Sequence, residues 1–265
     1  MEWINFPFFG ILTGVLWLLG SAIVWLPRES KVKYFIFHIL FLSGIVLFSY
    51  FLAALWINLE RAPMRTLGET RLWYAFFIGV IGYLTYLRWK YKWFLSYNVV
   101  MALVFIIINL VYPENFSKIL MPALQSPWFV PHVIVYIFGY ALLGAATLVA
   151  VKGLYLEYFK TFRKPLLKLS DNLVYLGFAF LTLGLLFGAI WAKEAWGHYW
   201  TWDPKETWAF ITWLAYLLYI HYRISKPSKV RAPLWILGLA FIILLVAWFG
   251  VNYLPAAQDS IHVYS

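Results

Sequence analysis

The chain has 265 residues, of which 64% are hydrophobic and only 12% are charged, and its mean hydropathy is +0.77. Soluble domains are about 45–50% apolar and about 25% charged, so this composition excludes a soluble protein and indicates an integral membrane protein. The net charge is +10 but no nucleic-acid motif accompanies it, and the absence of cysteine excludes a disulfide framework or a redox dithiol within the chain.

Apolar runs recur along the whole chain and predict an all-α, polytopic bundle of about eight transmembrane helices. Most runs approach the roughly 20 residues that a helix needs to cross the hydrocarbon core, and the two shorter ones have aromatic flanks suited to the membrane interface. In chain order the predicted spans are 6–26, 34–57, 73–87, 93–111, 132–154, 173–191, 207–221 and 234–251. No repeat or long linker divides them, so residues 1–265 are predicted to form one membrane domain.

The distribution of Lys and Arg between the spans predicts the orientation. Basic residues collect in cytoplasmic loops. Of the 21 Lys and Arg residues, 15 fall in loops 26–33, 88–92, 152–170 and 223–233. Both termini and the three intervening loops are therefore predicted to be extracytoplasmic. The net charge mostly reflects this bias and is not evidence for a nucleic-acid partner.

The outer loop 112–131 contains four apolar residues at helical spacing. They are Phe116, Ile119, Leu120 and Ala123, which share one face if the segment is helical. This pattern predicts a short helix on the outer membrane surface. A lid that packs over the bundle fits the same pattern equally well.

The outer loop 192–206 leads into the next span through a helix-start signal. Asp203 is followed by Pro204 and, three residues on, by Glu206. This combination predicts an N-cap, a proline at the first helical position and a capping-box partner. The capping role also holds the preceding loop at a fixed place, so it is compatible with a binding function.

The segment W-G-H-Y-W-T-W-D-P-K-E-T-W, residues 196–208, is unusually rich in tryptophan. An interfacial belt explains about half of the 16 tryptophans, but not those inside a loop. A flat aromatic surface on a rigid loop suits a large planar apolar ligand such as a porphyrin. The candidate ligand-binding residues, in a loop of about residues 192–207 and the helix start, are Trp196, Trp200, Trp202, Asp203, Lys205 and Trp208.

Haem iron needs axial ligands, which are most often histidines. His132 at the outer end of the fifth span and His262 in the outer tail lie on the same predicted face as the tryptophan loop. Each alone would normally be interpreted as a polar residue near water, but the two together on the face of the tryptophan loop favour ligation of haem iron. His221 and His38, near the inner ends of their spans, are candidates for an inner haem site, with His38 the weaker one, because ionisable groups within spans are costly. His198 receives no role.

Propionate carboxylates call for cations near the porphyrin. Lys205 and Lys193 border the tryptophan loop, and three arginines lie in the outer loop 58–72. Any one of these cations taken singly is better explained as a solvated surface charge.

The tryptophan segment resembles the "WWD" signature of haem-handling membrane proteins, in the CcsA/ResC branch of the system II cytochrome c biogenesis machinery. The resemblance extends to P-A-L-Q-S-P-W-F-V-P-H, I-T-W-L-A-Y-L-L-Y-I-H and F-G-V-N-Y-L-P with I-H-V-Y, and so covers the chain from about Leu120 onward. It implies that His132 and His262 ligate external haem iron and that His221 belongs to an inner site. The tail departs from the family's H-S-Y pattern, which leaves the local geometry of His262 open.

The resemblance further implies haem b, iron protoporphyrin IX, as the bound group. It implies a CcsB/ResB-type membrane partner, which supplies the second inner histidine in that family, and an apocytochrome c with a CxxCH segment as the acceptor. The chain is expected to be part of a holocytochrome c synthase, or haem lyase, complex in a bacterial cytoplasmic or thylakoid-type membrane. Thioether attachment requires reduced thiols, and this chain has no cysteine with which to reduce them. A thiol-reducing partner is therefore expected.

Two alternatives stay open at the level of sequence. The chain is a haem chaperone or exporter without a direct role in ligation, or it is a multi-span ion or lipid transporter in which His38 and His221 relay protons. Few ionisable groups lie within the predicted spans, and there is no obvious pair of broken half-helices, which disfavours the transporter.

Overall fold

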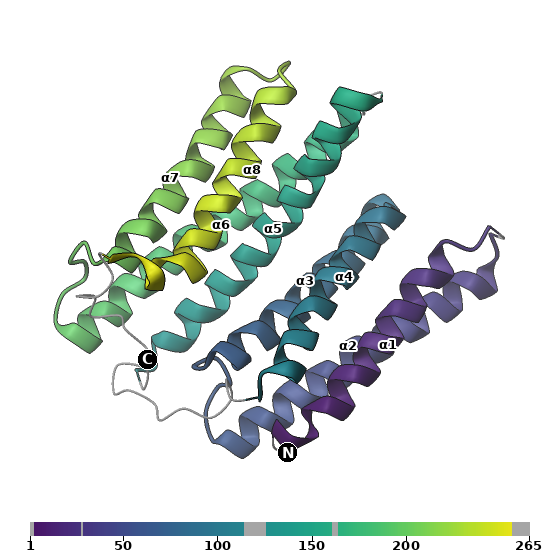
Figure 1. Cartoon of the computed structure of the whole chain (residues 1–265), viewed down its shortest axis with the longest axis horizontal. Coiled ribbons are helices and arrows are strands. Elements are labelled where there is room, and N and C mark those ends of the chain that lie inside the picture. Colours follow the sequence, from purple (N-terminus) through teal and green to yellow (C-terminus); the bar gives the residue numbers. More distant parts are fainter. Residues whose placement is uncertain (1–2, 28, 114–125, 161–163, 256–265) are drawn as a thin grey trace. The chain divides into compact units, whose positions relative to one another are not determined.

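A computed structural model describes residues 3–27, 29–113, 126–160 and 164–255, and every regular element in these ranges is helical (Figure 1). The predicted all-α fold is therefore confirmed. In chain order the elements are the 3-10 turn η1 (Trp3–Asn5), α1 (Phe6–Val24), α2 (Lys31–Leu59), α3 (Leu67–Trp89), α4 (Lys92–Val111), α5 (Phe129–Phe159), α6 (Lys164–Trp196), α7 (Pro204–Ser225), α8 (Arg231–Leu245), the π turn η4 (Val246–Gly250) and the 3-10 turn η5 (Val251–Tyr253).

Within the described ranges, six of these helices are long and apolar enough to cross a membrane, namely α1, α2, α4, α5, α6 and α8. This finding supports an integral membrane protein. The two shorter predicted spans, 73–87 and 207–221, form the central parts of α3 and α7. Both helices carry charged residues in their first and last turns, such as Glu69 and Arg88 in α3, which lowers their hydropathy.

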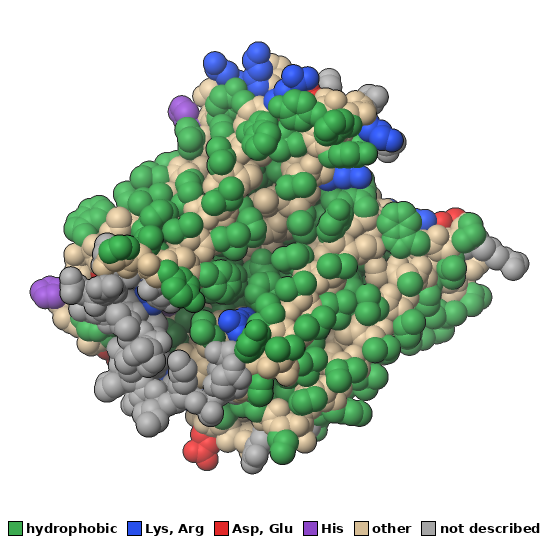
Figure 2. Space-filling view, in the orientation of Figure 1, with side chains coloured by type: hydrophobic (Ala, Val, Ile, Leu, Met, Phe, Trp, Pro, Cys, Tyr) green, Lys and Arg blue, Asp and Glu red, His purple; other side chains and the backbone are tan. Residues whose placement is uncertain are grey.

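The surface of the helices is mostly apolar, as contact with lipid requires. Figure 2 shows hydrophobic side chains along the sides of the helices, and Lys and Arg gathered where α5 turns into α6 and α7 into α8. These turns belong to two of the basic loops that are predicted to be cytoplasmic.

The helices group into two compact units, Met1–Ile119 and Leu120–Ser265. In the first unit α1 packs against α2 and α4, and α3 packs against α4. In the second unit α5 packs extensively against α6, and α8 packs against both α5 and α7.

A partly buried salt bridge joins α6 to α7 in the second unit. The guanidinium of Arg223 donates from Nε and Nη2 to the two carboxylate oxygens of Asp171, each at 2.8 Å. The hydroxyl of Tyr219 donates to the same carboxylate at 2.8 Å. Since this charge pair is largely removed from water and fully hydrogen-bonded, it fixes the register of α7 on α6.

The first unit is built around Trp17, which is fully buried. Its ring stacks on Phe41 with centroids 5.6 Å apart, and its indole Nε1 donates to the Phe41 carbonyl at 3.3 Å. Gly44 and Gly79 leave the space for this ring, because a Cβ at either position would lie within 2.7 Å of an indole atom. Helix packing here depends on the two glycines.

We expect Gly79→Ala to lower the free energy of unfolding by about 1–3 kcal/mol, because an added methyl 2.5 Å from Trp17 Cη2 forces the ring or α3 to move. The measurement is thermal unfolding of the detergent-purified protein. Gly238→Ala is the matched control, since nothing lies within 4 Å of a Cβ there. Equal unfolding temperatures for the two variants would contradict the prediction.

Candidate functional site

The tryptophan segment begins on a helix rather than in a loop. Residues 192–196 were predicted to be loop, but α6 continues through them to Trp196. Ala, Lys and Glu are good helix formers, and Lys193 near the C-terminus complements the helix dipole. Gly197 then ends the helix with a left-handed φ of 85°, and the Lys193 ammonium donates to its carbonyl at 2.7 Å. Trp196 is thus held by a packed helix end.

The predicted helix start after the tryptophan loop is confirmed. Asp203 is the N-cap of α7, its side chain accepts from the Lys205 amide at 3.0 Å, and Pro204 opens the helix. Glu206 completes the capping box by accepting from the amides of Asp203 at 3.2 Å and Thr201 at 2.8 Å. These bonds fix the backbone of the loop on both sides of Trp202.

Trp202 has a left-handed backbone with φ 60°, and 64% of the residue is exposed. A bulky residue in this conformation costs about 1–3 kcal/mol and persists only where the surroundings impose it. Its ring packs edge-on against Trp200, with centroids 5.7 Å apart, and against Phe210 at 6.0 Å. The indole Nε1 of Trp200 is buried and has no hydrogen-bond partner among the described residues. The loop therefore exposes the ring of Trp202 beside the buried indole donor of Trp200.

His132 lies in the first turn of α5, and its ring is fixed on two sides. Its Nδ1 is 2.8 Å from the Gly184 carbonyl of α6. Because a carbonyl only accepts, Nδ1 carries the hydrogen and the lone pair of the neutral ring is on Nε2. The ring stacks on Trp191 with centroids 5.4 Å apart and an interplanar angle of 25°. Metal-binding histidines are oriented in this way, with one nitrogen donating to a carbonyl.

Trp191 connects His132 to the tryptophan segment. Its ring lies 4.8 Å from that of Trp196 and 5.1 Å from that of Phe129. Gly188, one turn before Trp191, allows the approach of His132, since a Cβ there would be 2.7 Å from the His132 Cε1. The sequence prediction missed Trp191, Gly184 and Gly188. The spacing of the two glycines by four residues in an apolar helix was the signal for close helix packing.

The predicted tryptophans therefore belong to two aromatic groups. Trp196 lies with Trp191 beside His132, whereas Trp200 and Trp202 lie with Phe210, which stacks on Trp213 at 6.0 Å. Trp208 is half-buried in the first turns of α7, where its carbonyl accepts from the Thr212 hydroxyl at 2.8 Å.

Lys205 is half-buried in the first turn of α7, beside the tryptophan loop. Burial lowers the pKa of its ammonium to about 8, although the neighbouring Asp203 acts in the opposite direction. A bound carboxylate would stabilise the protonated form and so raise this pKa again.

The other histidines lie in different surroundings. His221 is exposed on α7, on a face that also exposes Leu214 and Leu218. His38 belongs to the first unit, where its Nδ1 is 2.9 Å from the Tyr83 hydroxyl. His198 is exposed in the tryptophan loop. His262 and the helix predicted at residues 116–123 lie outside the described residues.

Within the ranges that the structure describes, no three His, Cys, Asp or Glu side chains gather as a metal ion held by protein alone requires. A porphyrin brings four nitrogen ligands of its own, so the protein need supply only axial ligands. The oriented imidazole of His132 fits that requirement.

Comparisons with known proteins identify the family of the chain. The sequence matches the cytochrome c assembly protein family over residues 64–257. It is 32% identical to a cytochrome c biogenesis protein CcsA from Guillardia theta over 96% of both chains. It is also 34% identical to a CcsA from Cuscuta reflexa over 76% of this chain and 77% of that protein. The likeness thus extends well before Leu120, where the motif resemblance begins, and the chain belongs to the cytochrome c assembly protein family.

Proposed function

We propose that the chain is the haem-binding subunit of a system II cytochrome c synthase, which moves haem to the outer membrane face and presents it to apocytochrome c. Membership of the family supports a role in cytochrome c maturation. The observation that carries the finer proposal is the His132 imidazole, held by the Gly184 carbonyl and by Trp191 with its lone pair on Nε2.

In this proposal haem b is the cargo, and His132 and His262 are its external axial ligands. Trp196, Trp200, Trp202 and Trp208 provide the aromatic surface for the ring. Asp203 acts indirectly, by capping α7 and holding the loop. Lys205, which is half-buried beside the tryptophan loop, is the proposed cation for a propionate, and the Trp200 indole is the proposed neutral donor. The protein contributes orientation, and haem contributes the reactive vinyl groups.

The inner site of the proposal centres on His221. The imidazole is exposed on an apolar stripe of α7 with Leu214 and Leu218. An ionisable side chain on such a stripe costs free energy in a membrane unless a partner protein packs against it. A CcsB/ResB-type membrane protein would cover it and supply the second inner ligand. His38 remains the weaker alternative for that ligand.

The topology of the proposal places both termini and the tryptophan loop in the extracytoplasmic space. The membrane is a bacterial cytoplasmic or thylakoid-type membrane, and residues 1–265 act as one membrane domain. Cysteine is absent from the chain, so the two thiols that form thioether bonds come from the CxxCH segment. A thiol-reducing partner would keep them reduced.

The attachment reaction tests this function directly. The chain is expressed together with a CcsB/ResB-type partner and an apocytochrome c with CxxCH, in cells that lack a cytochrome c maturation system of their own. We expect covalently bound haem in the cytochrome, detected by its absorption after acid extraction, and its loss with His132→Ala. Haem that loads onto this chain but never becomes covalent in the presence of the partner would favour a chaperone without a ligation role.

The affinity for haem is expected to fall as the pH rises through about 8, because the Lys205 ammonium loses its proton there and no longer attracts a propionate. Lys205→Arg keeps its charge over this range and should remove this component of the pH dependence. Haem titration of the purified protein between about pH 7 and pH 9.5 is the measurement. A pH dependence that is unchanged in Lys205→Arg would exclude Lys205 as the propionate cation.

A further inference from the structure

The loop between α2 and α3, in the first unit, encloses a buried carboxylate. Glu60 ends α2 with a left-handed φ of 54°, and Thr66 begins α3 with a capping box to Glu69. Glu69 is fully buried. A buried carboxylate needs a matched set of donors.

Arg61 and two backbone amides satisfy Glu69. The guanidinium of Arg61 donates from Nη2 to Oε1 at 2.7 Å and from Nη1 to Oε2 at 3.0 Å. The amides of Arg65 and Thr66 donate to Oε2 at 2.6 and 3.1 Å. Arg61 thus neutralises Glu69 and donates to both of its carboxylate oxygens.

Arg65 is the second arginine beside Glu69. Its side chain is half-buried, and its Nε is buried with no hydrogen-bond partner among the described residues. Burial and the charge of Arg61 both lower the pKa of the Arg65 guanidinium, which still stays protonated at neutral pH. A buried charged donor without an acceptor is costly, so the site favours an anion that supplies one.

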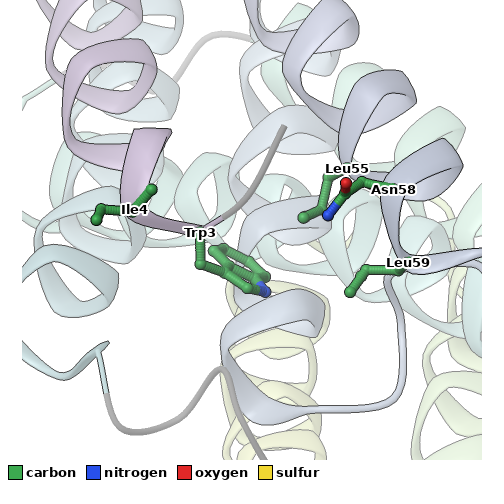
Figure 3. A pocket seen from close by; sticks show the side chains of 5 residues that line it. All are labelled: Trp3, Ile4, Leu55, Asn58 and Leu59. Carbon is green, nitrogen blue, oxygen red and sulfur yellow. The ribbon is translucent and has the colours of Figure 1, made fainter.

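An apolar hollow of about 300 Å³ lies at the neighbouring end of α2. It is lined by Trp3, Ile4, Leu55, Asn58 and Leu59, and Figure 3 shows the Trp3 ring facing the α2 side chains across it. Arg61 follows Leu59 by two residues, so their Cα atoms are at most roughly 7 Å apart. The hollow therefore lies at the start of the loop that carries Arg61 and Arg65, and the charges of these two arginines are close enough to act on each other.

We propose that this end of the first unit binds an anionic phospholipid, with its phosphate on Arg65 and one acyl chain in the hollow. A guanidinium binds phosphate oxygens in pairs. Free phosphate would satisfy Arg65 but would leave the hollow unused. Helices α1 and α2 are both apolar enough to span the membrane, and Ile4 beside the hollow is 82% exposed. Membrane lipid can therefore reach the site. This inference does not depend on haem binding.

Native mass spectrometry of the full-length protein, titrated with phosphatidylglycerol, tests the proposal. We expect Arg65→Gln to weaken lipid binding about tenfold or more, as the loss of a charged hydrogen bond does. Arg88→Gln is the matched control, because it removes an exposed arginine from the other end of α3. Leu59→Trp, which fills the hollow from a half-buried position, should also weaken binding while Arg65 is intact.

Three results would overturn the proposal. The first is that the Arg65→Gln and Arg88→Gln variants bind phosphatidylglycerol equally well. The second is that diacylglycerol with the same acyl chains binds to the protein as tightly as the phospholipid does. The third is that inorganic phosphate displaces the lipid completely while Leu59→Trp binds normally, which would identify a site for a soluble anion.

Discussion

Replacing His132 with alanine is expected to convert bound haem from a low-spin to a high-spin spectrum and to lower its affinity at least about tenfold. Loss of an orienting group alone costs metal sites 10–100-fold in affinity, and this substitution removes the proposed ligand itself. The geometry behind the expectation is the imidazole held by the Gly184 carbonyl at 2.8 Å. The measurement is the visible spectrum of the detergent-purified variant, oxidised and reduced, during haem titration.

His198→Ala is the control for this experiment, because His198 is exposed in the tryptophan loop and has no proposed role. Its spectrum and affinity should equal those of the unaltered protein. If His132→Ala also keeps a low-spin spectrum at full affinity, His132 is not an axial ligand.

Replacing Gly188 with alanine should reproduce much of this defect without touching the histidine. A Cβ at Gly188 would lie 2.7 Å from Cε1 and 2.8 Å from Nδ1 of His132, so the ring must move away from the Gly184 carbonyl. We expect haem affinity to fall about tenfold or more, since the tautomer and direction of the imidazole are no longer fixed. Haem titration and the spin state of the bound haem are the measurements.

Gly238→Ala again provides the matched control, because it places the same methyl in α8 where nothing lies within 4 Å. Thermal unfolding of both variants separates a displaced imidazole from general loss of structure. A Gly188→Ala variant with unaltered haem affinity would show that the contact between α6 and His132 does not matter for binding.

The helices could largely be predicted from the sequence because hydrophobicity dominates in a membrane. Each of the eight apolar runs forms a helix. Their ends were less accurate, since helix ends are set by local interactions rather than by hydropathy. α5 begins at Phe129 rather than His132, and α6 continues to Trp196 because its C-terminus is capped at Gly197.

The composition of the site could also be predicted, but its geometry could not. The D-P-K-E signal correctly gave the start of α7 because capping is a local interaction. The stacking of His132 on Trp191 and its bond to Gly184 link α5 to α6 across 52 residues or more, and no local pattern encodes such a pair. The left-handed backbone of Trp202 is imposed by its surroundings against its own preference.

The visible spectrum of the protein purified from haem-replete cells tests the central claim most directly. The claim predicts copurified haem with a low-spin, bis-histidine spectrum in both the oxidised and the reduced state, lost when His132 and His262 are each replaced by alanine. A protein that carries no haem under these conditions, or one whose spectrum is unaffected by both substitutions, would contradict the claim that its tryptophan loop and His132 form a haem site.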